Sequence, residues 1–166
     1  MSRLLLQALL VCSVACFTAC GPPSSDDLCK TSFEPYTDLV SGGLRSSRHA
    51  QFMQAMAAYN KGDYAQAEAQ FTSYLQGRTA DHTAYLYLAC SQLAQGKPYD
   101  AELSIDHLEN SNMDGFKDQC EWYTVLCWLC SGQNDRALDG AKAIAEAAHH
   151  TYKSEAQRIV DALATK

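Results

Sequence analysis

The sequence predicts an all-α fold in which about three helix–turn–helix units stack on one another and a last helix caps the stack. Gly62 and Gly96 lie 34 residues apart, and a third such glycine, Gly132, follows 36 residues later. Each of these glycines is followed five residues later by an alanine. From about Arg48 onward apolar residues recur at helical spacing, with no alternating strand pattern of useful length. A period of this length is typical of stacked helical pairs.

The predicted elements follow from this period. A first helix begins at about Arg48 and ends before the turn at Gly62, and Pro98 suits the start of a later helix because its missing N–H costs nothing there. The remaining helices are predicted at about 64–75, 79–94, 99–108, 116–130, 135–148 and 152–164. The last of them places Ile159 and Leu163 on one face, as expected of a helix that covers the open end of a stack.

The N-terminus predicts an export signal. An uncharged apolar run from Leu4 to Ala19 follows Arg3, and it is shorter than a typical membrane-spanning helix. The run ends in Ala19-Cys20-Gly21, which resembles the lipobox of bacterial lipoproteins. The resemblance implies that residues 1–19 are removed and that Cys20 is acylated, which would anchor the chain to a membrane. The alternative is an ordinary secretory signal with an incidental cysteine.

Under this interpretation the protein is located in the bacterial cell envelope and faces away from the cytoplasm. The residue after the acylated cysteine is Gly21 rather than an aspartate, and in this the chain resembles lipoproteins that are forwarded to the outer membrane. Residues 20–47 are expected to be a flexible tether, because Gly, Pro, Ser and Asp dominate its first part. Phe33, Tyr36, Leu39 and Val40 are apolar enough to dock on the domain that follows at 48–166. The formal net charge of −6 argues against nucleic acid as a partner.

The helical units resemble the tetratricopeptide repeat family. Tyr85, Leu88 and Ala89 match the aromatic, large and small positions of its first helix. The small residue of its second helix matches Ala67, Ala101 and Ala137. The resemblance implies a right-handed superhelical stack whose concave face is lined by the first helix of each unit. Val125 stands where a small residue is expected, which predicts a wider crossing in the third unit. An unrelated helical bundle is the alternative.

The resemblance implies a partner-binding groove on the concave face. Aromatic and methionine side chains in such a groove suit an extended peptide or a helix of a partner protein. The candidate residues are Phe52, Met56, Tyr59, Leu86, Tyr87, Trp122 and Tyr123. The alternative is that most of these side chains only pack between neighbouring units.

The cysteines that remain after signal removal and acylation are Cys29, Cys90, Cys120, Cys127 and Cys130. Cys120, Cys127 and Cys130 fall on one stripe of a predicted helix that is apolar nearly all round, which favours their role as small core residues. Three alternatives stay open: a Cys127–Cys130 redox pair, a bridge from Cys90 to a third-unit cysteine, and a zinc site that adds His149 and His150. The pattern contains no catalytic constellation and calls for no cofactor or metal.

The function expected from these observations is that of a membrane-anchored lipoprotein, acting as an adaptor or assembly subunit through protein–protein contacts. It is not expected to be an enzyme. The alternative function is that of a thiol-dependent redox or metal-handling protein that uses the third-unit cysteines.

Overall fold

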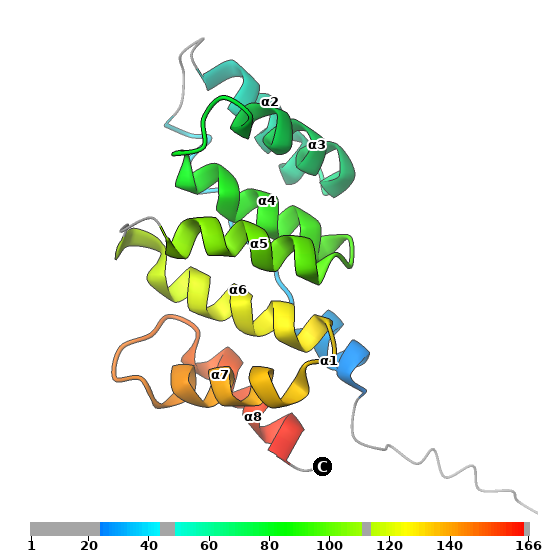
Figure 1. The fold of residues 1–166 in the computed structure, drawn as a ribbon, viewed down its shortest axis with the longest axis vertical. Coiled ribbons are helices and arrows are strands. Elements are labelled where there is room, and N and C mark those ends of the chain that lie inside the picture. Colours follow the sequence, from blue (N-terminus) through cyan, green and yellow to red (C-terminus); the bar gives the residue numbers. More distant parts are fainter. Residues whose placement is uncertain (1–23, 44–48, 111–113, 165–166) are drawn as a thin grey trace, which may run out of the picture.

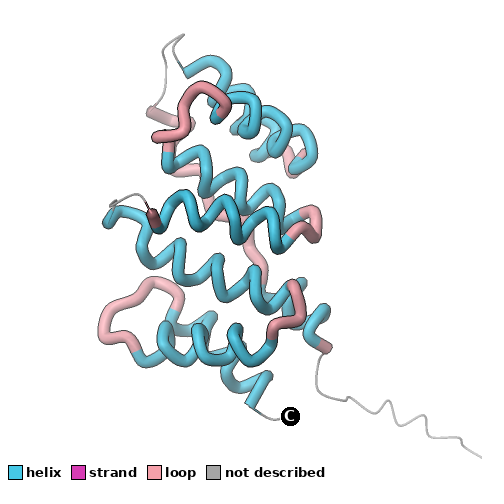
Figure 2. The backbone as a smooth tube through the Cα atoms, viewed as in Figure 1, coloured by secondary structure: helices cyan, strands magenta, loops and turns pink. Residues whose placement is uncertain are grey.

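A computed structural model of the chain describes residues 24–43, 49–110 and 114–164, and within these ranges it is helical without strands (Figures 1 and 2). The predicted all-α class is confirmed, because successive helices pack against one another in adjacent pairs. The helices are α1 (Ser25–Ser32), α2 (Ala50–Asn60), α3 (Tyr64–Leu75), α4 (His82–Ala94), α5 (Pro98–Glu109), α6 (Lys117–Cys130), α7 (Asn134–Glu146) and α8 (Lys153–Ala164).

The three turn glycines have the same conformation in each unit. Gly62, Gly96 and Gly132 have φ values of 75°, 70° and 77°, which glycine adopts without the steric penalty of a side chain. In each turn, the amide that follows the glycine donates to a carbonyl five residues back, at 2.8 to 3.0 Å. This closing pattern of a helix satisfies carbonyls that the helix leaves free. The period in the sequence therefore corresponds to a repeated turn in the structure.

The core runs through all three units. The predicted small residues Ala67, Ala101 and Ala137 are fully buried, which lets the helices of each pair approach closely. In the third unit the large Val125 is accommodated by Gly140 on α7. A Cβ atom built on Gly140 would lie 2.7 Å from Cγ2 of Val125. The small residue expected on the first helix of this unit is thus found on the second.

The segment before α2 differs from the expected flexible tether. Residues 25–32 form α1, whose N-terminus is capped by Ser24, since its side chain accepts a hydrogen bond from the Asp27 amide. Residues 33–40, named the strap here, follow in a non-helical, extended course. In Figure 1 the strap passes behind the stack as a cyan trace, between α1 and the first unit. The proposed acylation site, Cys20, and residues 44–47 lie outside the described residues.

Two features bear on the compartment of the protein. A disulfide joins Cys29 of α1 to Cys130 at the end of α6. Disulfides persist in oxidising surroundings, so this bond indicates a location outside the cytoplasm. In the described ranges, none of the helices combines the length and apolarity needed to cross a membrane.

Candidate functional site

The strap lies across the face formed by α2, α4 and α6, the first helix of each unit; this face is named the inner face. Each of the three helices contributes one tyrosine whose hydroxyl donates a hydrogen bond to a main-chain carbonyl of the strap. The distances are 2.8 Å from Tyr59 to Tyr36, 3.1 Å from Tyr87 to Thr37 and 2.9 Å from Tyr123 to Glu34. The Tyr87 hydroxyl also accepts from the Leu39 amide at 3.2 Å. The strap is therefore bound through its backbone.

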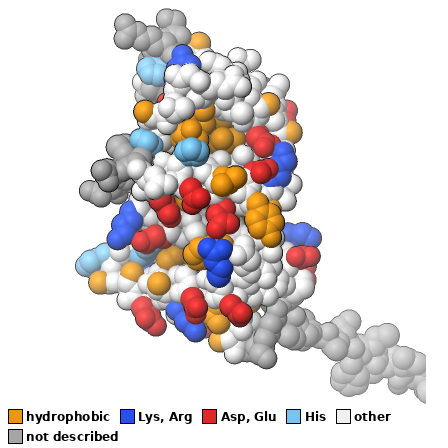
Figure 3. Space-filling view, in the orientation of Figure 1, with side chains coloured by type: hydrophobic (Ala, Val, Ile, Leu, Met, Phe, Trp, Pro, Cys, Tyr) orange, Lys and Arg blue, Asp and Glu red, His pale blue; other side chains and the backbone are white. Residues whose placement is uncertain are grey.

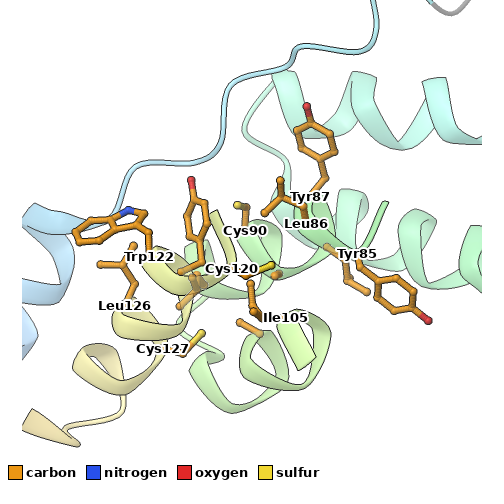
Figure 4. Packing of buried hydrophobic residues seen from close by; sticks show 14 of the residues in the cluster. Tyr85, Leu86, Tyr87, Cys90, Ile105, Cys120, Trp122, Leu126 and Cys127 are labelled. Carbon is orange, nitrogen blue, oxygen red and sulfur yellow. The ribbon is translucent and has the colours of Figure 1, made fainter. Parts of the chain in front are cut away.

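Figure 4 shows the strap side of this arrangement, where Tyr87 and Trp122 point toward the extended trace. Tyr85 and Cys127 point to the other side of α4 and α6. Tyr87 and Tyr123 stand at the same position of successive units, nine residues before the turn glycine. The repeat thus presents the same donor twice along the inner face.

Burial fixes the protonation state of the three tyrosines. Loss of hydration raises the pKa of Tyr87 to about 12 and raises the pKa values of Tyr59 and Tyr123 further. A neutral hydroxyl keeps its proton, so each of these side chains is a hydrogen-bond donor throughout the physiological pH range.

Asp38 anchors the far end of the strap. Its carboxylate accepts from the amides of Val40 and Ser41 at 3.0 and 2.9 Å and from Nδ2 of Asn60 on α2 at 2.6 Å. Burial alone would raise the pKa of Asp38, but the hydrogen bonds from Ser41, Asn60 and Val40 outweigh it and hold this pKa below the ordinary value. The charged form of Asp38 therefore fastens the strap to the first unit.

The candidate groove residues gather on or beneath the inner face. All seven are buried, with exposures between 0% and 5%: Phe52, Met56, Tyr59, Leu86, Tyr87, Trp122 and Tyr123. Their rings pack together, with centroids 5.1 Å apart for Tyr59 and Tyr87 and 6.4 Å apart for Phe52 and Tyr87. The tyrosine hydroxyls reach the strap, whereas Met56 and Leu86 are fully enclosed. Binding of a separate partner by these residues stays a prediction.

The strap covers the inner face without filling it. A hollow of about 170 Å³ lies beside Pro35 and Tyr36, against Trp122 and Tyr152. A second hollow, of about 330 Å³, adjoins Val40 and Phe52 at the other end of the strap. No strap side chain is fully buried, and Leu39 is 69% exposed.

The cysteines do not form the pairs considered from the sequence. Cys130 is bonded to Cys29, so the interpretation of Cys127 and Cys130 as a redox pair is wrong, and Cys90 remains a free thiol. Burial raises the pKa of the Cys90 and Cys120 thiols to about 11 and raises that of Cys127 further. Buried thiols of this kind are unreactive core residues. The sequence did not identify Cys29 as the partner, because connectivity depends on the fold.

The histidines considered for zinc lie elsewhere. Nε2 of His150 is 3.2 Å from Glu121 and 3.9 Å from Asp118, near the start of α6, whereas Cys130 is at its end. Nδ1 of His150 accepts from the Tyr152 amide at 3.1 Å, so in the neutral ring the proton resides on Nε2. The neighbours of this ring are therefore the carboxylates of Asp118 and Glu121 rather than the cysteines. His149 is exposed.

No protein-family model matches the chain, and neither a curated protein nor a solved structure matches it.

Proposed function

We propose that this chain is a lipid-anchored envelope protein of the tetratricopeptide-repeat type. In this proposal it acts as an adaptor whose inner face binds an extended segment of a partner protein. The site is the one that the strap occupies. The observation that carries the proposal is the set of three tyrosine hydroxyls that bind an extended backbone through its carbonyls. Main-chain recognition of this kind accepts many sequences, so a partner segment can make the same contacts.

The shallow seating of the strap supports exchange with a partner segment. The floor beneath it is buried and aromatic, whereas the strap itself has only exposed or half-buried side chains. Its removal would expose part of this floor together with Phe33, Tyr36 and Val40, which pack against the core, so an incoming segment would have to replace these contacts. The hollows at its two ends leave room for larger side chains than Pro35 and Val40.

The location in the envelope rests on two independent observations. The lipobox-like end of the export signal predicts acylation at Cys20, and the Cys29–Cys130 disulfide fits an oxidising compartment. Residues 21–24 would then separate the lipid from α1, so the domain would sit close to the membrane surface.

Site-directed photocrosslinking in intact cells tests the adaptor function. A photoreactive phenylalanine analogue replaces Asn60, an exposed residue beside the strap. In the control it replaces Tyr99, which is 63% exposed on α5. This helix lies on the face in Figure 3, where charges of both signs are mixed. We expect a partner crosslinked from position 60 but not 99, and competed away by a peptide of residues 33–41.

Two results of this experiment would contradict the proposal. If position 60 crosslinks only within the chain, or if the strap peptide does not compete with the crosslinked protein, the inner face is not a partner site. Mass spectrometry of the crosslinked product distinguishes these outcomes.

A further inference from the structure

We propose that the Cys29–Cys130 disulfide is a redox latch: while it is closed the strap stays on the inner face, and its reduction opens that face to a partner peptide. This inference rests on the proposed function, since it adds regulation to the same site. It concerns a bond between the segment before the repeats and the third repeat unit.

The position of the disulfide suits a latch. Cys29 lies in α1, and the strap begins directly after the end of this helix at Ser32. Cys130 ends α6, the helix that also contributes Tyr123 to the strap. The Cα atoms of the two cysteines are 5.0 Å apart. The bond therefore fixes the N-terminal end of the strap at the third unit.

α1 packs against α6 and α8, but apart from the disulfide it buries little apolar surface of its own. Its buried residue is Leu28, and its polar link to the stack is a 2.8 Å hydrogen bond from Asn134 to the Ser25 hydroxyl. A helix of eight residues is not stable by itself in water. With the disulfide reduced, we expect α1 to detach more often and to take the start of the strap with it.

A strap fixed at both ends resists exchange more strongly than one fixed at a single end. The closed latch holds one end, and the chain continues into α2 at the other. A competing peptide would have to displace the whole strap at once. With the latch open, the strap can peel from the α6 end, so that the contacts of Glu34 and Tyr36 are lost first. Each lost contact frees a tyrosine hydroxyl for the incoming backbone.

The disulfide is accessible, unlike the free thiols. Cys29 and Cys130 are half-buried, and a hollow of about 440 Å³ adjoins Cys130, Gly132 and Pro98. Cys90, Cys120 and Cys127 are buried, with raised pKa values, so they do not exchange with the bond. Among the cysteines that the structure describes, a response to reductant is thereby confined to this bond.

The reaction requires an external dithiol, such as an envelope dithiol oxidoreductase. One thiolate of the dithiol attacks a sulfur of the Cys29–Cys130 bond, forming a mixed disulfide, and the other protein sulfur leaves and takes up a proton. The second thiol of the reductant then attacks the mixed disulfide and releases the second protein thiol. Two electrons pass to the protein, and the dithiol becomes a disulfide.

The test uses the full mature chain, oxidised or reduced with dithiothreitol. Hydrogen exchange of the Leu39 amide, bound to Tyr87, reports on the strap. Fluorescence anisotropy measures binding of a labelled peptide of residues 33–43. On reduction we expect Leu39 exchange to rise roughly tenfold or more, and the peptide to bind only the reduced protein. Cys29→Ser should behave as permanently open, whereas Cys120→Ser, which leaves the disulfide intact, should behave as wild type.

Further outcomes separate failure of the latch from failure of the peptide site. An oxidised Tyr36→Ala variant loosens the strap without touching the disulfide. If the peptide binds this variant but not the reduced wild type, the peptide site stands and the latch is refuted. If the peptide binds none of these proteins, the proposed function fails and the latch with it. If reduction abolishes the helical circular dichroism, the bond is a structural staple and the latch is overturned.

Discussion

Tyr59, Tyr87 and Tyr123 each serve the core and the strap at once. Their rings are buried among other aromatic side chains, while their hydroxyls emerge at the inner face and bind the strap backbone. A tyrosine has an apolar body and a polar tip, which suits a position at the boundary between core and surface. The two interpretations of these residues, packing between units and binding at a groove, are therefore compatible.

Removal of the Tyr87 hydroxyl is the first residue-scale test. Tyr87→Phe removes a donor to Thr37 and an acceptor for Leu39 but keeps the ring. Because water can replace these bonds at the shallow strap, we expect a loss of about 1 kcal/mol in strap binding, or roughly fivefold faster Leu39 exchange. Tyr85→Phe is the matched control, since Tyr85 lies on the other side of α4. Equal exchange rates in the two variants would contradict this role.

Substitution of Gly140 is the second residue-scale test. In Gly140→Ala the new methyl group would lie 2.7 Å from Val125 and 3.0 Å from Trp128. Overpacking costs about 1 to 3 kcal/mol, against about 1 kcal/mol gained in helix propensity, so we expect a net loss of about 1 kcal/mol in the free energy of unfolding. Val125→Ala should relieve the closer of these two contacts, so the loss from Gly140→Ala should be smaller in that background. Additive losses in urea titrations would show that these side chains do not compete.

Residue identity could be predicted well where the repeat constrains it. The alanines and turn glycines follow from the period, and the resemblance to tetratricopeptide repeats implies which aromatic residues line the inner face. Gly140 could not be predicted as the counterpart of Val125, because that requires knowledge of which residues face each other across α6 and α7. The Cys29–Cys130 bond was missed for the same reason. Its sequence separation of 101 leaves no local pattern to read.

At the scale of elements, the repeated turn sets the angle between the helices of each unit. Gly96→Ala places a side chain at a φ of 70°. We expect a loss of about 1 to 2 kcal/mol in the free energy of unfolding, because a side chain is disfavoured in this left-handed conformation. A Cβ atom at Gly96 would meet no neighbour, so the effect would arise from the backbone alone.

Gly115→Ala provides the control for this turn, since Gly115 also faces open space but has no positive φ. Its free energy of unfolding should change by less than about 0.5 kcal/mol, as for ordinary surface substitutions. Equal effects of the two substitutions, measured by thermal and urea unfolding, would refute the conformational argument.

The strap and α1 are the elements that the sequence described least well. Ser24, Asp26 and Asp27 are favourable at a helix start. However, the helix is too short to be expected without knowledge of the surface that it contacts. The contacts with the three tyrosines are made through backbone carbonyls of the strap, which every sequence possesses, so these contacts leave no trace in its side chains. The apolar character of Phe33, Tyr36 and Val40 predicted docking on the domain, and these side chains pack against its core. The same prediction for Leu39 is wrong, because its side chain is 69% exposed.

At the scale of the whole molecule, the strap changes how the units depend on one another. In a stack of repeats each unit contacts only its neighbours. Here one segment contacts all three units, and the disulfide ties its start to the third. The strap therefore supplies contacts between distant units, which should make unfolding of the stack more cooperative.

Carboxylates join neighbouring parts of the stack and make its stability depend on pH. Burial opposes the charged form of Glu68, but hydrogen bonds from Lys97 and Gln95 outweigh it and lower its pKa. The pKa of Asp118 is lowered mainly by its hydrogen bond from the Thr151 side chain. The pKa of Glu109 shifts in the opposite direction, because burial and the charge of Asp106 raise it.

The lowered pKa values determine the sign of the pH dependence. A carboxylate whose pKa is lower in the folded chain stabilises the fold above its unfolded value, and this stabilisation is lost as the pH falls through the folded value. The melting temperature should therefore change little from neutral pH to about 5 and fall below about pH 4. Protonation of Glu109 acts in the other direction and should reduce the fall only in part, because it is one group against several.

The Glu68–Lys97 pair provides the specific test of this dependence. The two side chains meet at 2.6 Å between α3 and the turn before α5, with Glu68 only 18% exposed. Glu68→Gln removes the titrating group, so the variant should melt lower than wild type at pH 7 and show a smaller further loss in acid. Glu155→Gln is the control, because Glu155 and Arg158 form a longer pair of 3.8 Å within a single helix, with side chains 34% and 69% exposed, where ion pairs contribute little. If both variants retain the acid profile of the wild type, Glu68 does not link the first two units through its charge.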